Sequence, residues 1–295
     1  MNEPINKSMS QSFAKLEEQL EKAMAVQTAM ILFEWDNETL APREAAERTA
    51  RVIGSLSGQY LDIITGETVK KLLKQCRKEE ELLTQTQRAV VREVEEELEK
   101  LQGIPADEYR KFAELTARAT GIWADARKKK RFDLFAPVLK EIVDYQKRFA
   151  SYRAKKGQKL YDVMLNNYEK DFGMKELDEF FAVVKAGVVP LLKESAKRSE
   201  TIDDSFLTGP YTEEQQERAA RFLAEYVGFD FGRGVMAVSA HPFTTNLHNH
   251  DVRITTHYKI SLDSSLFSVI HESGHAIYEM GTRMFGMHSN MPLTQ

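Results

Sequence analysis

The pentapeptide His-Glu-Ser-Gly-His at residues 271–275 constrains this chain more than any other stretch. On a helix, residues four apart lie on one face, one turn above the other, so the imidazoles of His271 and His275 can reach the same metal ion. Glu272 follows His271 directly, where its carboxylate can act as a general base on a water held at that ion. The pattern therefore predicts a metal-binding helix suited to hydrolysis.

A pattern with only three fixed letters also arises by chance, so its surroundings must be considered. Apolar residues on both sides predict that the helix is largely buried: Leu266, Phe267, Val269, Ile270, Ala276 and Ile277. Buried imidazoles without a partner are costly, whereas metal-bound imidazoles are satisfied. All seven histidines lie in the last fifth of the chain, at positions 241, 248, 250, 257, 271, 275 and 288. Both observations favour a metal site.

Composition excludes several other classes. The 295 residues are 42% hydrophobic, which suffices for one large core or two smaller ones. A net charge of -4 with interleaved acids and bases argues against a nucleic-acid partner. Without a signal segment or an apolar run of about 18 residues, we expect a cytoplasmic chain with no membrane partner. The single cysteine, Cys76, lies among charged residues, and we expect a surface thiol that is not a nucleophile.

Apolar residues at three- and four-residue steps predict a series of amphipathic helices. The predicted helices span about 8–35, 43–64, 69–73, 86–101, 109–131, 133–149, 177–191 and 212–226. Turn-forming residues at 35–42 are expected to end the first helix, and Pro190 to kink the seventh. A capping box, Thr212 to Gln215, begins the eighth. The segment 161–172 is expected to be a loop whose aromatic side chains pack inward.

The character of the sequence changes after Phe229. Residues 235–239 and 252–258 are rich in β-branched side chains and predict two short strands, with 246–250 as the turn between them. The predicted fold is a mostly α-helical body, residues 1–228, with a small β element and the metal helix in residues 229–295. We expect the two parts to form one continuous domain.

Three motifs in order carry a resemblance to a known family. They are Ser-Ala-His-Pro-Phe-Thr-Thr at 239–245, Asp-Val-Arg-Ile-Thr-Thr at 251–256, and the stretch 264–279 around the pentapeptide. Together they resemble the carboxypeptidase Taq family of metal-dependent carboxypeptidases. Similar segments at 161–169 and 35–42 extend the resemblance over nearly all of the chain.

The resemblance implies a mostly helical, zincin-like metallopeptidase, often a homodimer, that removes residues from peptide C-termini with zinc or cobalt. It implies that His271 and His275 are metal ligands and that Glu272 is the general base and acid. His241 matches the family's His-Pro-Phe motif, which belongs to the neighbourhood of the active site.

Asp251, Arg253 and Thr255 match the family's Asp-x-Arg-x-Thr motif, which also lies near the active site. A carboxypeptidase needs a cation for the terminal carboxylate of its substrate, and Arg253 is a candidate. The alternative is that Arg253 makes ion pairs or backbone hydrogen bonds that hold the strand beside the metal helix.

The resemblance also implies further sequence beyond the metal helix, including a third ligand from a glutamate. This chain ends at Gln295, so we expect it to correspond to the N-terminal part of the family fold. Catalytic zinc normally has three protein ligands and a water. Within the chain, Glu279 and His288 are the possible substitutes.

Three functional hypotheses remain. The leading one is a metallocarboxypeptidase that acts on peptides with a free C-terminus and is incomplete as given. The alternative is a catalytically inactive helical scaffold or interaction protein. An endopeptidase with a different ligand set fits the metal motif but not the motifs that precede it.

Overall fold

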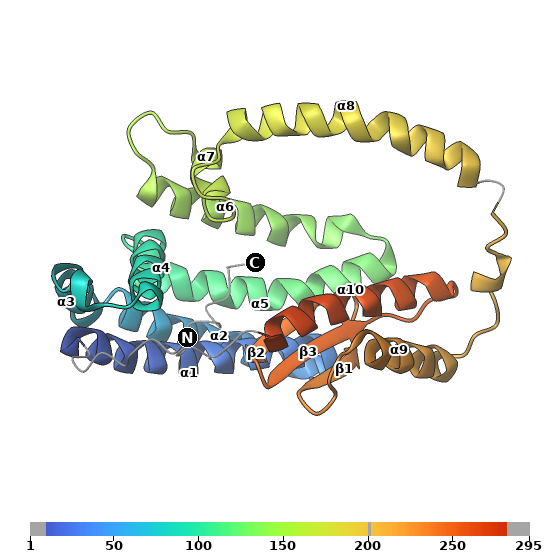
Figure 1. The fold of residues 1–295 in the computed structure, drawn as a ribbon, viewed down its shortest axis with the longest axis horizontal. Helices are drawn as coiled ribbons and strands as arrows, with labels where there is room; N and C mark the ends of the chain where they lie inside the picture. Colours follow the sequence, from blue (N-terminus) through green and yellow to red (C-terminus); the bar gives the residue numbers. More distant parts are fainter. Residues whose placement is uncertain (1–9, 200–201, 282–295) are drawn as a thin grey trace, which may run out of the picture. The chain divides into compact units, whose positions relative to one another are not determined.

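The computed structural model describes residues 10–199 and 202–281. Over these residues the chain forms long helices and one small sheet (Figure 1), which confirms the predicted fold class. It divides into two compact units. Among the described residues, unit 1 contains 10–145, 245–252 and 278–281, and unit 2 contains the remainder. The division expected at residue 228 stays a prediction.

Unit 1 is a helical body in which α1, α2 and α5 lie side by side (Figure 1). Its helices are α1 (Gln11–Thr39), α2 (Ala46–Ile64), α3 (Glu67–Lys78), α4 (Gln85–Leu101) and α5 (Ala106–Lys129). Phe13, Leu16 and Leu20 lie on one face of α1 and are buried in its core, as their spacing predicts. α2, α3 and α4 contribute the other walls of this core.

Helix ends in unit 1 follow side-chain chemistry. The Ser10 hydroxyl accepts a hydrogen bond from the Phe13 amide at 3.1 Å and so caps α1. The segment 35–42 ends this helix, as predicted, but the boundary expected at Trp35 is wrong, because α1 continues to Thr39. Trp35 is buried in the helix, and the Thr39 hydroxyl donates to the Trp35 carbonyl at 2.7 Å. Packing of Trp35 therefore outweighs the turn-forming residues that follow it.

The prediction that Cys76 is a surface thiol is also wrong. Its side chain is fully buried in the core of unit 1, on the same face of α3 as Val69, Leu72 and Leu73. The charged neighbours that suggest a surface thiol project from other faces of α3, because adjacent residues of a helix lie on different faces. Burial raises the pKa of the thiol to about 11. The thiol is consequently protonated at neutral pH, in line with the expectation that it is not a nucleophile.

Unit 2 contains the later helices of the chain and most of the sheet. α6 (Ala136–Arg153), β2 (Thr244–His248), β3 (Asp251–Thr256) and α10 (Leu262–Gly281) have residues in both units. The other elements are α7 (Leu160–Leu165), α8 (Met174–Ser199), α9 (Glu213–Val227) and β1 (Gly234–Val238). The capping box from Thr212 to Gln215 is present, with both of its hydrogen bonds.

The sheet has the order β1-β3-β2, with β3 in the centre. The predicted strands correspond to β1 and β3, but the turn predicted at 246–250 is wrong. Residues 246–248 belong to β2, which pairs with β3, and only Asn249 and His250 form the turn. His248 is consequently half-buried, while His250 is exposed.

Several residues predicted to point inward are exposed. The segment 161–172 contains the helix α7, and Tyr161 and Tyr168 are exposed. α8 continues through Pro190, and none of its residues is buried. Val143 on α6 is also exposed. An apolar stripe identifies the face that a helix can bury, but not whether another element covers that face.

The described residues include no helix that combines the length and the apolar content needed to span a bilayer.

Candidate functional site

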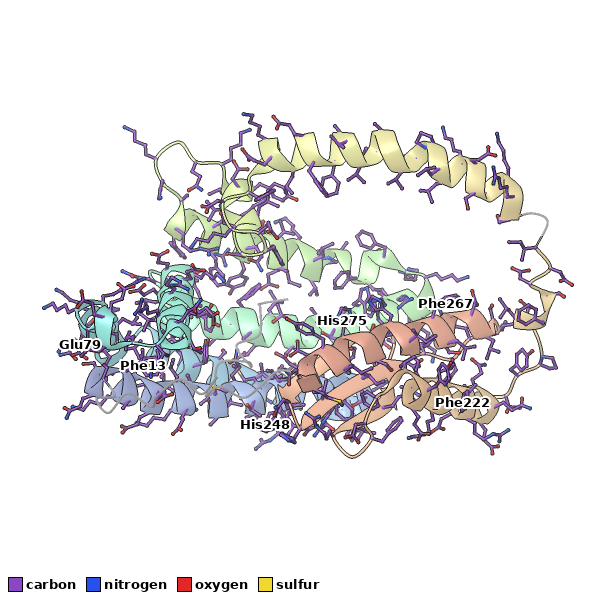
Figure 2. All side chains as sticks on the ribbon, viewed as in Figure 1. Phe13, Glu79, Phe222, His248, Phe267 and His275 are labelled. Carbon is purple, nitrogen blue, oxygen red and sulfur yellow. The ribbon has the colours of Figure 1, made fainter. Side chains whose placement is uncertain are left out.

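The predicted metal helix is α10, which buries one face and exposes the other. Val269, Ser273, Ala276 and Met280 are buried at helical spacing. The opposite face is exposed and contains Phe267, Ile270, His271, Gly274, His275 and Tyr278; Figure 2 labels Phe267 and His275 on this helix. The expectation that the histidines lie on a largely buried helix is therefore wrong. The apolar residues around the motif are divided between the two faces.

The two histidines are arranged as a pair of metal ligands would be. Their Nε2 atoms are 3.1 Å apart, and the rings are nearly perpendicular, with centroids 4.7 Å apart. Two imidazole nitrogens that bind one tetrahedral zinc ion at about 2.0–2.1 Å lie about 3.3–3.4 Å apart. The observed separation is within a few tenths of an ångström of that value, so this pair fits a divalent ion.

A third ligand is not evident in the part of the chain that the structure describes. No cluster of three or more His, Cys, Asp or Glu side chains suited to a metal occurs there. The Glu279 carboxylate accepts a hydrogen bond from Asn246 Nδ2 at 2.6 Å. His288, the other substitute, lies outside the described residues. The described residues therefore contain two candidate ligands, His271 and His275, whereas catalytic zinc normally has three protein ligands.

Glu272 differs from its histidine neighbours in being buried, with 7% of its surface exposed. The Thr244 hydroxyl lies 2.5 Å from Glu272 Oε2 and 3.1 Å from the Glu272 carbonyl oxygen. The carboxylate is therefore held against the first residue of β2. Its place between the buried and exposed faces of α10 brings it beside the histidine pair and beside the sheet.

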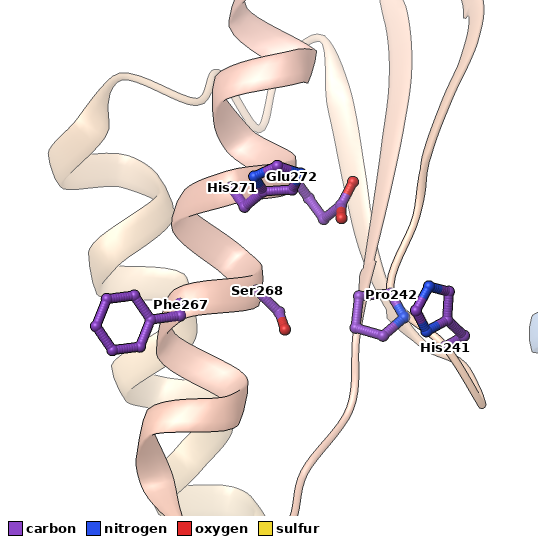
Figure 3. A pocket seen from close by; sticks show the side chains of 6 residues that line it. All are labelled: His241, Pro242, Phe267, Ser268, His271 and Glu272. Carbon is purple, nitrogen blue, oxygen red and sulfur yellow. The ribbon is translucent and has the colours of Figure 1, made fainter. Parts of the chain in front are cut away.

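An open pocket adjoins this carboxylate. Its walls come from α10 and from the loop between β1 and β2 (Figure 3). The lining residues are His241, Pro242, Phe267, Ser268, His271 and Glu272. His241, predicted from the His-Pro-Phe motif, is thus brought to the same pocket as two residues of the metal motif.

Thr255 holds the loop that forms one wall of this pocket. It is fully buried in β3, and its Oγ1 accepts hydrogen bonds from Ser239 Oγ at 2.7 Å and from the Phe243 amide at 2.9 Å. The Thr255 amide donates to the Phe243 carbonyl at 2.9 Å. These bonds fix the loop that contains His241.

The remaining predicted residues, Asp251 and Arg253, are half-buried in β3 and have interaction partners in the structure. Neither is among the residues that line the pocket. Analysis of the sequence missed the contact of Thr244, which appeared only as one letter of a motif. The feature of the sequence that could have indicated this contact is the position of Thr244, a hydroxyl residue at the start of a strand, immediately after the His-Pro-Phe segment.

Comparison with known proteins decides the family. The model of the carboxypeptidase Taq (M32) metallopeptidase family matches residues 15–294. The chain belongs to the carboxypeptidase Taq family. Carboxypeptidase 1 of Bacillus subtilis is 33% identical over 252 residues, which are 85% of this chain and 50% of the relative. Thermostable carboxypeptidase 1 of Pyrococcus furiosus is 29% identical over 278 residues, 93% of this chain and 54% of the relative.

Solved structures of the carboxypeptidase Taq family share the fold. Trypanosoma cruzi metallocarboxypeptidase 1 has a TM-score of 0.78 at 29% identity, covering 94% of this chain and 56% of that one. The M32 carboxypeptidase of Deinococcus radiodurans has a TM-score of 0.77 at 29% identity, covering 92% and 54%. The chain spans about half the length of the curated relatives that it matches.

Proposed function

We propose that this chain is the metal-binding part of a carboxypeptidase that releases amino acids from the C-terminus of peptides. The observation that carries the proposal is the Nε2 separation of 3.1 Å between His271 and His275, beside the Glu272 carboxylate. The family match supports the reaction class, because the relatives are named carboxypeptidases. Activity of the 295 residues alone depends on a third ligand beyond those that the structure describes.

The proposed mechanism assigns separate tasks to three residues. His271 and His275 would hold a divalent ion, zinc or cobalt, through their Nε2 atoms. When bound, such an ion polarises the scissile carbonyl and lowers the pKa of the attacking water. Glu272 takes one proton from that water and gives it to the leaving amine nitrogen. The pocket beside Glu272 receives the C-terminal end of the peptide.

Residues of the two other motifs are proposed to support the site. His241 lines the pocket and is close enough to contact a bound peptide. Thr255 holds the loop that contains His241, and Asp251 belongs to the same strand. Arg253 already has interaction partners and is half-buried, which favours a role in holding the strand over direct binding of the substrate carboxylate.

We further propose a cytoplasmic homodimer whose partners are peptides, without nucleic-acid or membrane partners. The net charge of -4, with acidic and basic residues in similar numbers, supports the exclusion of a nucleic-acid partner. A second candidate function, an inactive helical scaffold, is favoured by one observation. Large apolar side chains on α8, such as Phe180 and Leu191, are exposed, and exposed apolar surface of this kind can form a contact with another protein.

Metal content tests the proposal directly. The purified chain, dialysed against buffer and analysed for elements, is expected to retain near-stoichiometric zinc or cobalt. His271→Ala should lose this metal. The exposed His250 provides a matched control, and His250→Ala should retain it. Absence of metal from the wild-type chain would support the scaffold function, and metal retained in His271→Ala would contradict the proposed site.

Hydrolysis of a peptide with a free C-terminus tests the role of Glu272. In a preparation that hydrolyses such a peptide, Glu272→Gln should lower the rate by about 10²-fold to 10⁴-fold, since the amide cannot accept the proton. Metal content should remain that of the wild type. A rate unchanged by this substitution would contradict the mechanism.

A further inference from the structure

The first residue of β2 is in direct contact with the proposed general base. Thr244 Oγ1 lies 2.5 Å from Glu272 Oε2, whereas its distance to the Glu272 carbonyl oxygen is 3.1 Å. We infer that Thr244 is a positioning residue, which fixes the Glu272 carboxylate and leaves Oε1 as the oxygen that accepts the proton. This inference rests on the proposed function and deepens it by naming the group that orients its base.

The distances decide which acceptor receives the hydroxyl proton. A threonine hydroxyl has one hydrogen to donate, and two acceptors of residue 272 are within reach. A charged carboxylate forms shorter and stronger hydrogen bonds than a neutral carbonyl, and the 2.5 Å separation is the shorter one. The hydroxyl therefore donates to Oε2. With one oxygen occupied and the side chain 7% exposed, the carboxylate has little freedom to rotate.

Thr244 is itself held firmly. The preceding residue, Phe243, makes two hydrogen bonds of 2.9 Å with Thr255. Its amide donates to Thr255 Oγ1, and its carbonyl oxygen accepts from the Thr255 amide. Thr255 is fully buried in the central strand of the sheet. Because threonine is also branched at Cβ, few side-chain rotamers are open to it. A continuous set of contacts thus leads from β3 through Thr244 to Glu272.

The proposed reaction explains the value of this contact. A water proton moves to Glu272 Oε1 as the water oxygen bonds to the carbonyl carbon. The same proton then moves to the amine nitrogen as the carbon–nitrogen bond breaks, so proton and charge balance. The Thr244 hydroxyl hydrogen stays on its own oxygen throughout. A base that is already oriented avoids the cost of reorganisation during the proton transfer.

A double-mutant cycle tests the contact without requiring activity or metal. Thr244→Val removes the hydroxyl at nearly constant shape, Thr244→Ser retains it, and Glu272→Ala removes the carboxylate. Urea unfolding is measured on the 295-residue chain in the presence of a chelator. We expect Thr244→Val to lower the folding equilibrium constant about tenfold or more in the wild-type background, as for a hydrogen bond to a charged group. In the Glu272→Ala background the effect should fall below about threefold.

Crystal structures of the variants provide the second measurement. In Thr244→Ser the Glu272 carboxylate should keep its wild-type side-chain torsions, and the serine should recover most of the lost stability. In Thr244→Val the carboxylate should leave β2 and adopt other torsions. Equal effects of Thr244→Val in both backgrounds, or unchanged torsions in the valine variant, would overturn the inference.

The test separates this inference from the proposed function. Metal content is measured on the same proteins before the chelator is added. A wild-type chain without metal would contradict the proposed function and leave the measured coupling intact. A metal-binding chain with no coupling between residues 244 and 272 would contradict the positioning role alone.

Discussion

Asn246 Nδ2 donates a hydrogen bond of 2.6 Å to Glu279 Oε2, which connects β2 to the last turns of α10. Glu279 is four residues after His275, and this helical spacing alone makes it a possible third metal ligand. A carboxylate that already accepts a hydrogen bond from a neighbouring strand would have to break this contact to reach an ion. The contact therefore argues for a structural role of Glu279.

We predict that Glu279→Gln leaves the metal content of the chain unchanged, because the site does not use this carboxylate. His275→Ala, one turn earlier, should abolish metal retention. Elemental analysis of the dialysed proteins measures both. Loss of metal from Glu279→Gln would show that Glu279 is a ligand after all.

Cys76 is predicted to be unreactive in the folded chain. It is fully buried, and its pKa is raised to about 11, so both access and thiolate formation are suppressed at pH 8. A thiol reagent such as iodoacetamide should label it at pH 8 only at concentrations of urea that unfold unit 1. Rapid labelling without denaturant would contradict the buried position.

Alkaline pH should destabilise the chain through Tyr60. Burial, followed by the nearby Glu97 carboxylate, raises the pKa of Tyr60 in the folded state above its ordinary value near 10. As the pH rises, the unfolded chain loses the Tyr60 proton at a lower pH than the folded chain does. The contribution of Tyr60 to the free energy of unfolding is therefore fully present below pH 10 and decreases above it. The slope for one such group is about 1.4 kcal/mol per pH unit.

Tyr60→Phe removes this group and should reduce the alkaline slope, by up to about 1.4 kcal/mol per pH unit at the upper end of a series of urea unfolding measurements between pH 9 and 11. Near pH 7 the free energy of unfolding should fall by only about 0.5–1.5 kcal/mol in this variant, because the substitution removes one long hydrogen bond, in which the Tyr60 hydroxyl lies 3.4 Å from Glu97. Tyr109, which has a similarly raised pKa, should preserve part of the slope. An unchanged slope in Tyr60→Phe would contradict the assignment.

The core of unit 1 should respond strongly to a cavity. Leu16 on α1 is completely buried, so Leu16→Ala is expected to cost about 2–5 kcal/mol of unfolding free energy. Leu40, immediately after the same helix, is 71% exposed, and Leu40→Ala should cost less than about 0.5 kcal/mol. Equal losses in the two variants would show that α1 is packed differently.

Local patterns determined the parts of this protein that depend on neighbouring residues in the chain. The helix of His271 and His275 follows from a four-residue spacing, and the buried face of α1 follows from the spacing of Phe13, Leu16 and Leu20. The capping box at Thr212 is equally local. Such features could be predicted because hydrogen bonds and side-chain faces in a helix repeat every few residues.

Tertiary structure decided what lies opposite each of these faces. Cys76 is buried because its apolar neighbours on α3 meet other helices, whereas the apolar face of α8 has no buried residue. The contacts of Thr244 with Glu272 and of Asn246 with Glu279 join residues 28 and 33 positions apart. The period of a sequence specifies which side chains share a face, but burial and hydrogen bonding also require a partner, whose position depends on the folded chain.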